Sequence, residues 1–398
     1  MRARHPTKTN AAIKAFLVCP GLGQVCRGYE SFTRECFDAL YADNSLDVRL
    51  FKGRGPHGHT EHTIWNLSRN GMLAQAFGKL SGRGSYFVEQ LTFTASLIPH
   101  LLSDDPEVVF FSDGNVGNFL WHFRRIANRR YRLVFSNGGP LDPPFPRWDL
   151  VQQVSPEYAI QALAAGVSSV QQMLVPYGIA VPESWSPPRV EERNALRREF
   201  GLPINRPVLI SVGAINVEHK RMDYTLSEVA RLPPEQRPFL AMLGAQDPIS
   251  SPPIHKLAAQ LLPPTDYVIR TVAPADVSRH LRAANVFALA SLGEGFGRVF
   301  LEALSNGLPV ITHDYETAHY VLGASGYFGD LREPGVLANL VTLVLQQTAI
   351  NTVEAFTARH NDVRRRFGWP HLVPRYVAML RRAALMGSGA PLCSAAAE

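Results

Sequence analysis

Short apolar runs that are typical of β-strands alternate with helix-like segments through both halves of the chain. In the first half these runs are AFLVCP (15–20), DVRLFKG (47–53), DPEVVFFSDG (105–114), YRLVFSNGG (131–139), DLVQQVS (149–155) and QMLVPYGI (172–179). In the second half they are PVLISVGAI (207–215), PFLAMLGAQ (238–246), DYVIRTV (266–272) and VFALAS (286–291). Strand–loop–helix alternation at this spacing predicts parallel, doubly wound sheets. We therefore expect an α/β protein with two Rossmann-like domains that face each other across a cleft.

The segments between these runs set the expected domain boundaries. Helices are predicted near 30–42, over most of 64–103, after Asn115, and near 222–232, 254–262 and 274–284. A proline-rich stretch with one short charged helix interrupts the pattern, which indicates a linker. The predicted order is a first domain over 1–182, a linker over 183–206, and a second domain over 207–369. A helical tail follows, and residues 387–398 are expected to be disordered.

Composition narrows the choice of partners. The chain has 398 residues, 46% of them hydrophobic, which is enough for two cores, and a net charge of +6 with a pI near 9.2. This charge suits an anionic substrate, an anionic membrane surface or nucleic acid. The basic residues are mostly spread out, and the clusters at 124–132 and 364–369 are more typical of solvated helix faces. No nucleic-acid partner is expected.

The cysteines and the amino terminus indicate a reduced, cytoplasmic setting. Cys19, Cys26, Cys36 and Cys393 show neither metal-ligand spacing nor a disulfide framework. The basic start followed by AFLVCP superficially suggests a signal peptide, but the apolar run is short and is interpreted as the first strand. No apolar stretch approaches the roughly 20 residues that span a bilayer. A soluble or peripheral protein is expected.

The stretch EGFGRVFLEALSNGLPVI, residues 294–311, combines a glycine loop, a short helix and a buried strand. Gly295 and Gly297 precede a helix predicted over 298–306, and Gly307 is expected as its left-handed cap. A glycine loop at a helix N-terminus suits a phosphate group. Glu302 lies in an apolar turn where an unpaired charge would be costly, so it needs hydrogen-bond donors. Sugar hydroxyls would satisfy Glu294 and Glu302.

Three other motifs leave alternatives open. Gly21 and Gly23 begin a G-x-G pattern, but Cys26 occupies the third position, so the dinucleotide fingerprint fails. His57, His59, His62 and Glu61 resemble metal ligands without a usual zinc spacing, and a polar loop is the favoured interpretation. Lys220 and Arg221 follow a strand by a few residues and are either surface charges or cations that neutralise a diphosphate.

Glu294 and Glu302 resemble the E-x7-E signature of family 4 of the retaining GT-B glycosyltransferases. The resemblance covers the second domain, with PVLISVGAI and Lys220, the LGAQ turn at 243–246, and VIRTVAPADVSRHLRAANVF. The segment FGWPHLVPRYVAML resembles the family's C-terminal helix, which implies that a helix near 370–386 returns to complete the first domain. VPYGI (175–179) resembles the segment ahead of the family's linker.

The resemblance implies roles for individual residues. Glu302 would bind the ribose of a nucleotide diphosphate sugar, Glu294 would contact the transferred sugar, and Lys220 would stabilise the leaving diphosphate. Backbone at Arg270, Thr271 and Val272 would contact the base edge. The implied donor contacts further include Gly23, Gly28, Gly213, Arg221, Gly244, Gly295, Phe296, Gly297, Arg298 and Val299. No metal ion or other cofactor is implied, because Lys220 and the N-terminus of the helix predicted over 298–306 would take the place of a metal ion.

Two positions depart from the family pattern. The family commonly has an arginine where Ala214 stands, and Asn216, His219 and Arg221 are candidates to compensate. The family's first-domain histidine is absent, and Asp113 or Asn137 is the candidate catalytic group in its place.

The resemblance therefore implies a retaining, metal-independent glycosyltransferase of polysaccharide or glycolipid biosynthesis. It would transfer a sugar from a nucleotide sugar to a hydroxyl of a glycan, a lipid-linked molecule or a small molecule, in the cytoplasm or peripherally at the inner membrane face. The alternatives are a degenerate GT-B protein that acts as a partner subunit, and a GT-B-fold epimerase or phosphorylase.

Overall fold

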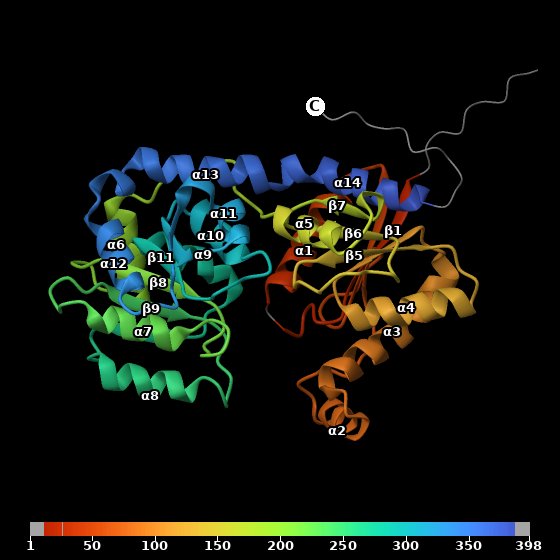
Figure 1. The fold of residues 1–398 in the computed structure, drawn as a ribbon, viewed down its shortest axis with the longest axis horizontal. Coiled ribbons are helices and arrows are strands. Elements are labelled where there is room, and N and C mark those ends of the chain that lie inside the picture. The colour runs from red at the N-terminus through yellow and green to blue at the C-terminus, as the bar shows by residue number, and fades with distance from the viewer. Residues whose placement is uncertain (1–11, 26, 387–398) are drawn as a thin grey trace, which may run out of the picture. The chain divides into compact units, whose positions relative to one another are not determined.

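The computed structural model describes residues 12–25 and 27–386, and the chain divides into two compact units. Unit 1 comprises Met1–Gly178 with Trp369–Glu398, and unit 2 comprises Ile179–Gly368. Each unit contains one parallel β-sheet with helices against it (Figure 1). The expected tail at 387–398, and Cys26 and Cys393, lie outside the described residues.

Unit 1 contains a seven-stranded sheet in the order β3-β2-β1-β4-β5-β6-β7, and all neighbouring strands are parallel. Its strands are β1 (Ile13–Cys19), β2 (Leu46–Lys52), β3 (Glu61–Thr63), β4 (Val108–Phe111), β5 (Arg132–Asn137), β6 (Leu150–Gln153) and β7 (Gln172–Leu174). Its helices are α1 (Gly28–Tyr41), α2 (Met72–Ser81), α3 (Gly84–Asp104), α4 (Gly114–Ile126), α5 (Pro156–Ala164) and α14 (Trp369–Leu385). The strand order reverses between β1 and β4, which defines the switch point of this sheet.

Unit 2 contains a six-stranded parallel sheet in the order β10-β9-β8-β11-β12-β13. Its strands are β8 (Val208–Val212), β9 (Phe239–Leu243), β10 (Tyr267–Arg270), β11 (Val286–Leu289), β12 (Val310–His313) and β13 (Gly326–Gly329). Its helices are α6 (Val190–Phe200), α7 (Met222–Arg231), α8 (Pro252–Leu261), α9 (Pro274–Ala283), α10 (Arg298–Ser305), α11 (Glu316–Leu322), α12 (Val336–Gln346) and α13 (Val353–Phe367). Here the order reverses between β8 and β11.

The strands of each sheet consist mainly of apolar residues because they are buried on both faces of the sheet. In β4 and β11, for example, every residue is buried. The core of unit 1 is rich in aromatic rings, among them Phe16, Phe93 and Phe135, whereas that of unit 2 consists mainly of aliphatic side chains such as Leu209, Leu240 and Ile311. The two cores are separate, as expected for two domains of this size.

The last helix, α14, packs into unit 1 although it comes last in the chain. The hydroxyl of Tyr376 donates to the carbonyl of Pro176 at 2.9 Å, and Nε2 of Gln152 donates to the same hydroxyl at 2.8 Å. At the start of α14 the indole of Trp369 lies so close to Gly178 that a Cβ at this position would be 2.7 Å from the ring. These contacts hold α14 against the amino-terminal part of the chain.

The segment expected as a linker, 183–206, carries α6, and this helix packs within unit 2. Arg197 is buried, and its Nε donates to the carbonyl of Ala283 at 2.9 Å while Nη2 bonds to Asn285. The ring of Phe200 stacks on His280 of α9 with centroids 3.7 Å apart. The helix of this segment therefore packs against α9 as part of unit 2.

Most predicted elements are present, but α11, β13 and α12 were not predicted, and the loop expected over 54–63 is wrong at its end. Glu61–Thr63 forms β3, which pairs in parallel with Leu50, Phe51 and Lys52 of β2. Three residues are too few for a periodic pattern, so the strand left no signal in the sequence.

Among the residues that the structure describes, no helix combines the length and the apolar character needed to cross a bilayer. Cys19 and Cys36 are both buried.

Candidate functional site

The switch point of the second sheet brings two distant loops together. β8 and β11 are neighbours, with Val286 opposite Leu209 and Phe287 opposite Ile210. In doubly wound sheets, ligands generally bind outside the carboxyl ends of the strands at the point where the strand order reverses. The loop after β8 contains Lys220, and the loop after β11 contains Glu294.

The loop after β8 is folded so that the Lys220 side chain lies over a glycine. Oδ1 of Asn216 accepts hydrogen bonds from the backbone N–H groups of His219 at 3.3 Å and Lys220 at 2.9 Å. The Lys220 stem then crosses Gly213, where an added Cβ would lie 3.1 Å from Cδ of the lysine. Gly213 and Asn216 therefore set the path of the lysine toward the neighbouring loop.

Lys220 and Glu294 form an ion pair at this edge. Nζ of Lys220 donates to Oε1 of Glu294 at 2.5 Å, and the two side chains are only 14% and 10% exposed. Nε2 of His219 lies 4.0 Å from the same carboxylate oxygen. A charge pair this far from water needs both partners, because either charge alone would be desolvated without compensation.

The glycine loop after Glu294 leads into the N-terminus of α10, as predicted from the sequence. Gly297 has a left-handed backbone with φ of 76°, and a Cβ there would lie 2.5 Å from the ring of Phe300. Phe296 is buried and packs edge-on against Phe367 with centroids 5.8 Å apart. The first backbone N–H groups of a helix have no partner within it, so this N-terminus carries the donors and partial positive charge that suit an anion. Gly307 has a φ of 80°, as expected for its place after the helix.

Glu302 lies on α10 itself, where it is partly buried. Its backbone carbonyl accepts from Oγ of Ser305 at 2.9 Å and from Nδ2 of Asn306 at 2.8 Å, which closes the last turn of the helix. Glu294 thus lies in the loop that precedes α10, and Glu302 lies on α10 itself. Arg298 and Val299 form the first turn between them.

Gly244 and the residues at the end of β10 lie along the same edge of the sheet. Gly244 follows β9 and is packed so tightly that a Cβ would overlap the carbonyl oxygen of Gly213. Its N–H donates to the carbonyl of Arg270 at 3.0 Å, and its carbonyl accepts from Oγ1 of Thr271 at 2.9 Å. Val272 follows directly. The guanidinium of Arg270 donates instead to the carbonyl of Phe200 at 2.8 Å, and burial lowers the pKa of this arginine.

Arg221 is adjacent to Lys220 in the chain but its guanidinium is directed elsewhere. The residue has a left-handed backbone with φ of 48°, its Nη1 donates to the carbonyl of Leu331 at 2.6 Å, and its guanidinium lies 4.4 Å from the ring centroid of Tyr224. Asn216, His219 and Arg221 were the candidates to compensate for the arginine that is missing at Ala214. The side chains of Arg221 and Asn216 are thus engaged by backbone groups. His219 is the one beside Glu294.

In unit 1, Asp113 lies at the switch point between β1 and β4. It is buried after β4, where its carboxylate accepts hydrogen bonds from the hydroxyl of Tyr86 and from Nε2 of Gln90, the latter at 2.9 Å. Burial raises the pKa of Asp113 above its ordinary value. Gly23, in the loop after β1, has a φ of 81°, and a Cβ there would overlap the carbonyl of Arg54. Gly28 starts α1 and has open space around it.

Asn137, at the end of β5, forms hydrogen bonds within the fold through both polar atoms of its side-chain amide. Nδ2 donates to Oε1 of Gln153 at 2.9 Å, and Oδ1 accepts from the N–H of Leu141 at 2.9 Å. The side chain is 2% exposed. In this arrangement Asn137 secures the loop after β5, whereas Asp113 belongs to a cluster of ionisable groups.

Sequence reasoning missed that cluster. Arg27 pairs with buried Glu30 at 2.6 Å, and Arg69 pairs with fully buried Glu89. Both guanidinium groups lie over the ring of Tyr86, with Cζ atoms 5.8 and 4.2 Å from its centroid. Burial raises the pKa of the Tyr86 hydroxyl. These residues are spread over three segments, so no spacing in the sequence marks them.

The histidine-rich loop is held by ion pairs of its glutamate. Glu61 bonds to Lys52 and lies 2.7 Å from Nη1 of Arg34. His62 stacks on Phe51 and lies near His57 and His100. Within residues 12–25 and 27–386, no group of three or more potential ligand side chains is placed to hold a metal ion.

Comparison with known proteins shows a similarity in the second unit. Residues 206–347, which contain Lys220, Glu294 and α10, match the family model described as Glycosyl transferases group 1. This segment is therefore similar to group 1 glycosyl transferases. Among curated proteins, the chain is 29% identical over 212 residues to the D-inositol 3-phosphate glycosyltransferase of Nocardioides sp., which covers 49% of this chain and 46% of that protein. The chain thus matches about half the length of this relative.

Solved structures are similar in fold to both units. Sucrose-phosphate synthase from Thermosynechococcus elongatus has a TM-score of 0.72 at 16% identity, covering 93% of this chain and 98% of that one. HepE from Anabaena, in complex with UDP-glucose, has a TM-score of 0.70 at 16% identity, covering 92% and 98%. The fold is GT-B, with two Rossmann-like α/β units.

Proposed function

We propose that the chain is a glycosyltransferase that transfers a sugar from a nucleotide diphosphate sugar to an acceptor hydroxyl. The observation that carries this proposal is the Lys220–Glu294 pair at the switch-point edge of the second sheet, next to the N-terminus of α10. A cation and a helix N-terminus at one edge suit a diphosphate, and the carboxylate beside them suits sugar hydroxyls. The match of this same segment to a group 1 domain supports the assignment.

In the proposed reaction, the bond between the anomeric carbon and the diphosphate oxygen breaks, and a bond from the acceptor oxygen to that carbon forms. The nucleotide diphosphate leaves with the bonding electrons, and its departing oxygen takes the proton that the acceptor hydroxyl loses. Lys220 and the N–H groups of the 295–298 loop stabilise the charge that develops on the leaving group, a contribution that increases toward the transition state. No metal ion is needed for this role.

The carboxylates have separate tasks in this proposal. Glu294 exchanges its contact with Lys220 for hydroxyls of the transferred sugar, which releases the ammonium for the diphosphate. Glu302, on α10, accepts hydrogen bonds from the ribose, and the backbone at 270–272 contacts the base. The finer assignment is to family 4, with retention of configuration, as the E-x7-E spacing implies.

The donor is proposed to be a UDP-sugar, because HepE, whose fold is alike, is described in complex with UDP-glucose. The acceptor is a hydroxyl of a glycan, a lipid-linked molecule or a small molecule. Asp113 is the unit 1 group proposed to act on the acceptor side, since it is a carboxyl group at a switch point with a raised pKa.

The experiment that tests the proposal is a thermal-shift panel followed by turnover. Wild-type protein is melted with UDP-glucose, UDP-galactose, UDP-N-acetylglucosamine, GDP-mannose and each free nucleotide, because a ligand that binds only the folded state raises the melting temperature by mass action. Donors that bind are then incubated without acceptor, and slow hydrolysis is followed in buffer containing EDTA. The anomeric configuration of a transfer product, read by NMR, tests retention.

We expect at least one nucleotide sugar to raise the melting temperature and to be hydrolysed in the presence of EDTA. If no nucleotide sugar binds, the proposed function is wrong and a partner subunit with a degenerate site is favoured. Loss of hydrolysis in EDTA that returns with magnesium would contradict only the metal-independent part.

A further inference from the structure

Trp65 is an exposed indole on a tethered loop of unit 1. Its side chain is 64% exposed and follows β3 by two residues, at the carboxyl edge of the sheet. The N–H of Ile64 donates to the carbonyl of Lys52 at 3.0 Å, and the N–H of Leu67 donates to Oγ1 of Thr92 at 3.0 Å. Backbone hydrogen bonds on both sides of Trp65 restrict this loop, which reduces the ordering cost when a ligand stacks on the ring.

The next residue, Asn66, belongs to a pair of side-chain amides at the same edge. Its Oδ1 accepts from Nε2 of Gln24 at 2.8 Å, and Gln24 also donates to the carbonyl of Pro20 at 3.3 Å. Gly53 leaves room for this contact, since a Cβ there would overlap Nε2 of Gln24. Nδ2 of Asn66 is buried and has no hydrogen-bond partner among the described residues. An unsatisfied amide beside an exposed aromatic ring suits a sugar, which has polar hydroxyls around an apolar ring face.

The arginines of the neighbouring cluster are already compensated. Nε and Nη2 of Arg27 donate to the carboxylate of Glu30, and Arg69 donates to the carboxylate of Glu89 through its guanidinium and its backbone N–H. Glu30 and Glu89 are both buried. An anion that competed for these arginines would leave a buried glutamate without its partner, which is costly. The four charges cancel, so they do not attract an anionic ligand.

Asp113 belongs to the same cluster and adds no positive charge. Its carboxyl group accepts hydrogen bonds from the hydroxyl of Tyr86 and from Nε2 of Gln90. A carboxyl group bonds to sugar hydroxyls in either protonation state, and its ionised form repels an anion. Arg54, in the loop after β2, is an exposed cation of this edge. Arg54 is thus the position at which charged and uncharged ligands can be told apart.

The separation of Trp65 and Asp113 sets the length of a ligand that contacts both. They follow β3 and β4, which are three places apart in the order β3-β2-β1-β4. At the usual spacing of about 4.8 Å between neighbours, the two strands end roughly 14 Å apart. A single sugar ring is much shorter than this distance. A ligand that contacts both residues therefore needs at least two linked rings.

We propose that the acceptor is an uncharged oligosaccharide, with one ring stacked on Trp65 and the reacting hydroxyl at Asp113. This inference rests on the proposed glycosyltransferase function and narrows its acceptor to one chemical class. Trp65 determines specificity and takes no part in the reaction itself, because it binds a ring that lies away from the reacting hydroxyl. A monosaccharide at Asp113 gains nothing from the indole.

Quenching of tryptophan fluorescence by acrylamide tests the stacking without any donor. Of the chain's five tryptophans, Trp65 is exposed, Trp121, Trp148 and Trp185 are half-buried, and Trp369 is buried. The probes are maltotriose, cellotriose, lactose and mannobiose, with glucose and galactose as monosaccharides and glucose 6-phosphate and glucuronic acid as charged sugars. At least one uncharged oligosaccharide should lower the quenching of wild-type protein and leave that of W65F unchanged. The inference is overturned if no uncharged oligosaccharide of this set shields Trp65.

Turnover with the donor selected by the thermal-shift panel tests the specificity. W65A should raise the KM of the oligosaccharide about tenfold with kcat little changed, because a buried aromatic face supplies much of the binding energy of a contact. Turnover of a monosaccharide and acceptor-free hydrolysis should stay the same, and W65F should restore most of the loss. The matched control is I160A, since Ile160 on α5 is also 64% exposed. Equal KM values for W65A and I160A would overturn the inference, as would equal losses for monosaccharide and oligosaccharide.

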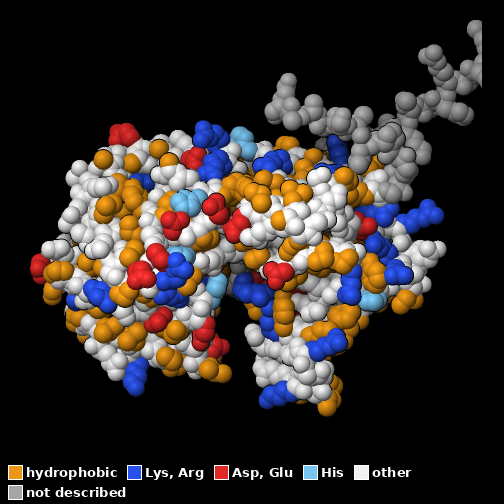
Figure 2. All heavy atoms as spheres, viewed as in Figure 1, with side chains coloured by type: hydrophobic (Ala, Val, Ile, Leu, Met, Phe, Trp, Pro, Cys, Tyr) orange, Lys and Arg blue, Asp and Glu red, His pale blue; other side chains and the backbone are white. Residues whose placement is uncertain are grey.

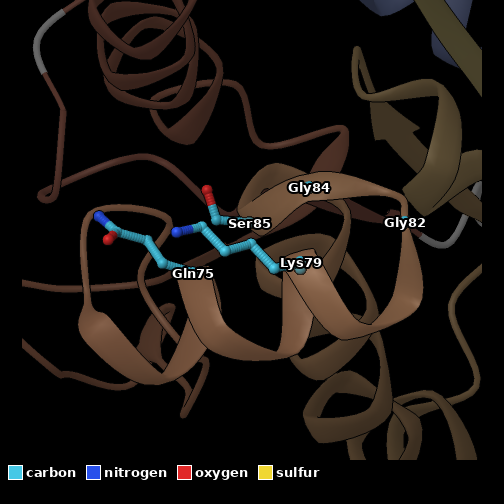
Figure 3. Close-up of a pocket in the computed structure, with 6 residues that line it drawn as sticks. Gln75, Lys79, Gly82, Gly84 and Ser85 are labelled. Carbon is cyan, nitrogen blue, oxygen red and sulfur yellow. The ribbon is translucent and has the colours of Figure 1, made fainter.

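The variant R54Q tests the charge of the acceptor and should leave the KM of the oligosaccharide unchanged. Its matched control is K79Q, which changes another exposed cation of unit 1. Lys79 lines a shallow hollow between α2 and α3, together with Gln75, Ser85 and three glycines (Figure 3). In Figure 2, hydrophobic and basic side chains lie together at this end of the unit. A charged sugar that is the better acceptor, and whose turnover R54Q but not K79Q weakens, would overturn the uncharged class.

Failure of the proposed function gives a different pattern from failure of this inference. If the function is wrong, no nucleotide sugar binds or is hydrolysed, whatever the sugars do to the fluorescence of Trp65. If only the acceptor class is wrong, the donor is bound and hydrolysed, but uncharged oligosaccharides neither shield Trp65 nor depend on it for turnover.

Discussion

Nζ of Lys220 lies 2.5 Å from Oε1 of Glu294, although 74 residues separate the two in the chain. The contact exists because β8 and β11 are neighbours in the sheet, so the loops that follow them share one edge. Both side chains are largely buried, and each therefore depends on the other for compensation of its charge.

The pair should be energetically coupled in the protein without substrate. Glu294→Gln and Lys220→Met are each expected to lower the free energy of unfolding by about 1–3 kcal/mol, since each leaves a desolvated partner. The double variant should lose less than the sum, with a coupling of about 1 kcal/mol or more. Urea unfolding of the four proteins measures this, and strictly additive losses would show that the pair is not coupled.

Gly244 should tolerate no side chain. A Cβ at this position overlaps the carbonyl of Gly213, whose backbone cannot move without displacing the Lys220 loop. Gly244→Ala is expected to destabilise the protein by at least about 2 kcal/mol, as overpacking does. Gly293→Ala is the control, because a Cβ added there would have no other atom within 4 Å and the backbone φ is not left-handed. Equal melting temperatures for the two variants would contradict the expected clash.

Substitution of Glu302 should weaken the binding of the donor without lowering the stability of the fold. Glu302→Gln removes the charge proposed to accept ribose hydroxyls, so donor affinity should fall roughly tenfold to a hundredfold, the usual effect of a hydrogen bond to a charged group. Isothermal titration with the donor selected by the panel measures the change. Glu354→Gln, on the exposed first turn of α13, is the matched control. The ribose assignment fails if Glu302→Gln binds the donor as tightly as Glu354→Gln does.

Asp113 should make the stability of the protein depend on pH. Burial raises the pKa of its carboxyl group in the folded state, so the folded protein keeps this proton over a range in which the unfolded chain has lost it. The stabilising contribution is therefore complete below the ordinary pKa of aspartate and is lost as pH rises through the folded value. Asp113→Asn removes the titration and keeps an oxygen for Tyr86 and Gln90.

The difference in unfolding free energy between wild-type protein and Asp113→Asn should therefore shift in favour of the variant as pH rises from about 4. Urea titrations across a range of about pH 4–8 measure it. Asp142→Asn, an exposed position of the same unit, controls for the loss of one acidic side chain. A difference that is constant over this range would show that the folded pKa of Asp113 is not raised.

Local patterns in the sequence predict much of this fold. The helix predicted at 298–306 is observed as Arg298–Ser305, and the glycine at its end has the left-handed backbone that was expected. The helices predicted at 222–232 and 274–284 are observed as Met222–Arg231 and Pro274–Ala283. Apolar periodicity and helix-ending residues act over a few positions, so a single sequence records them.

Contacts between distant segments leave no such record. The cluster of Arg27, Arg69 and Tyr86 forms only once three segments have folded together. The direction of Arg221 also depends on the fold, because its partner is the carbonyl of Leu331, 110 residues away.

The turnover of Lys220→Ala tests the central claim most directly. At saturating donor, kcat should fall about 10²–10³-fold, as it does when one group that stabilises transition-state charge is removed. Lys256→Ala, which changes an exposed lysine of the same unit, should leave kcat unchanged. Full turnover by Lys220→Ala, with its melting temperature within a few degrees of the control, would contradict the account.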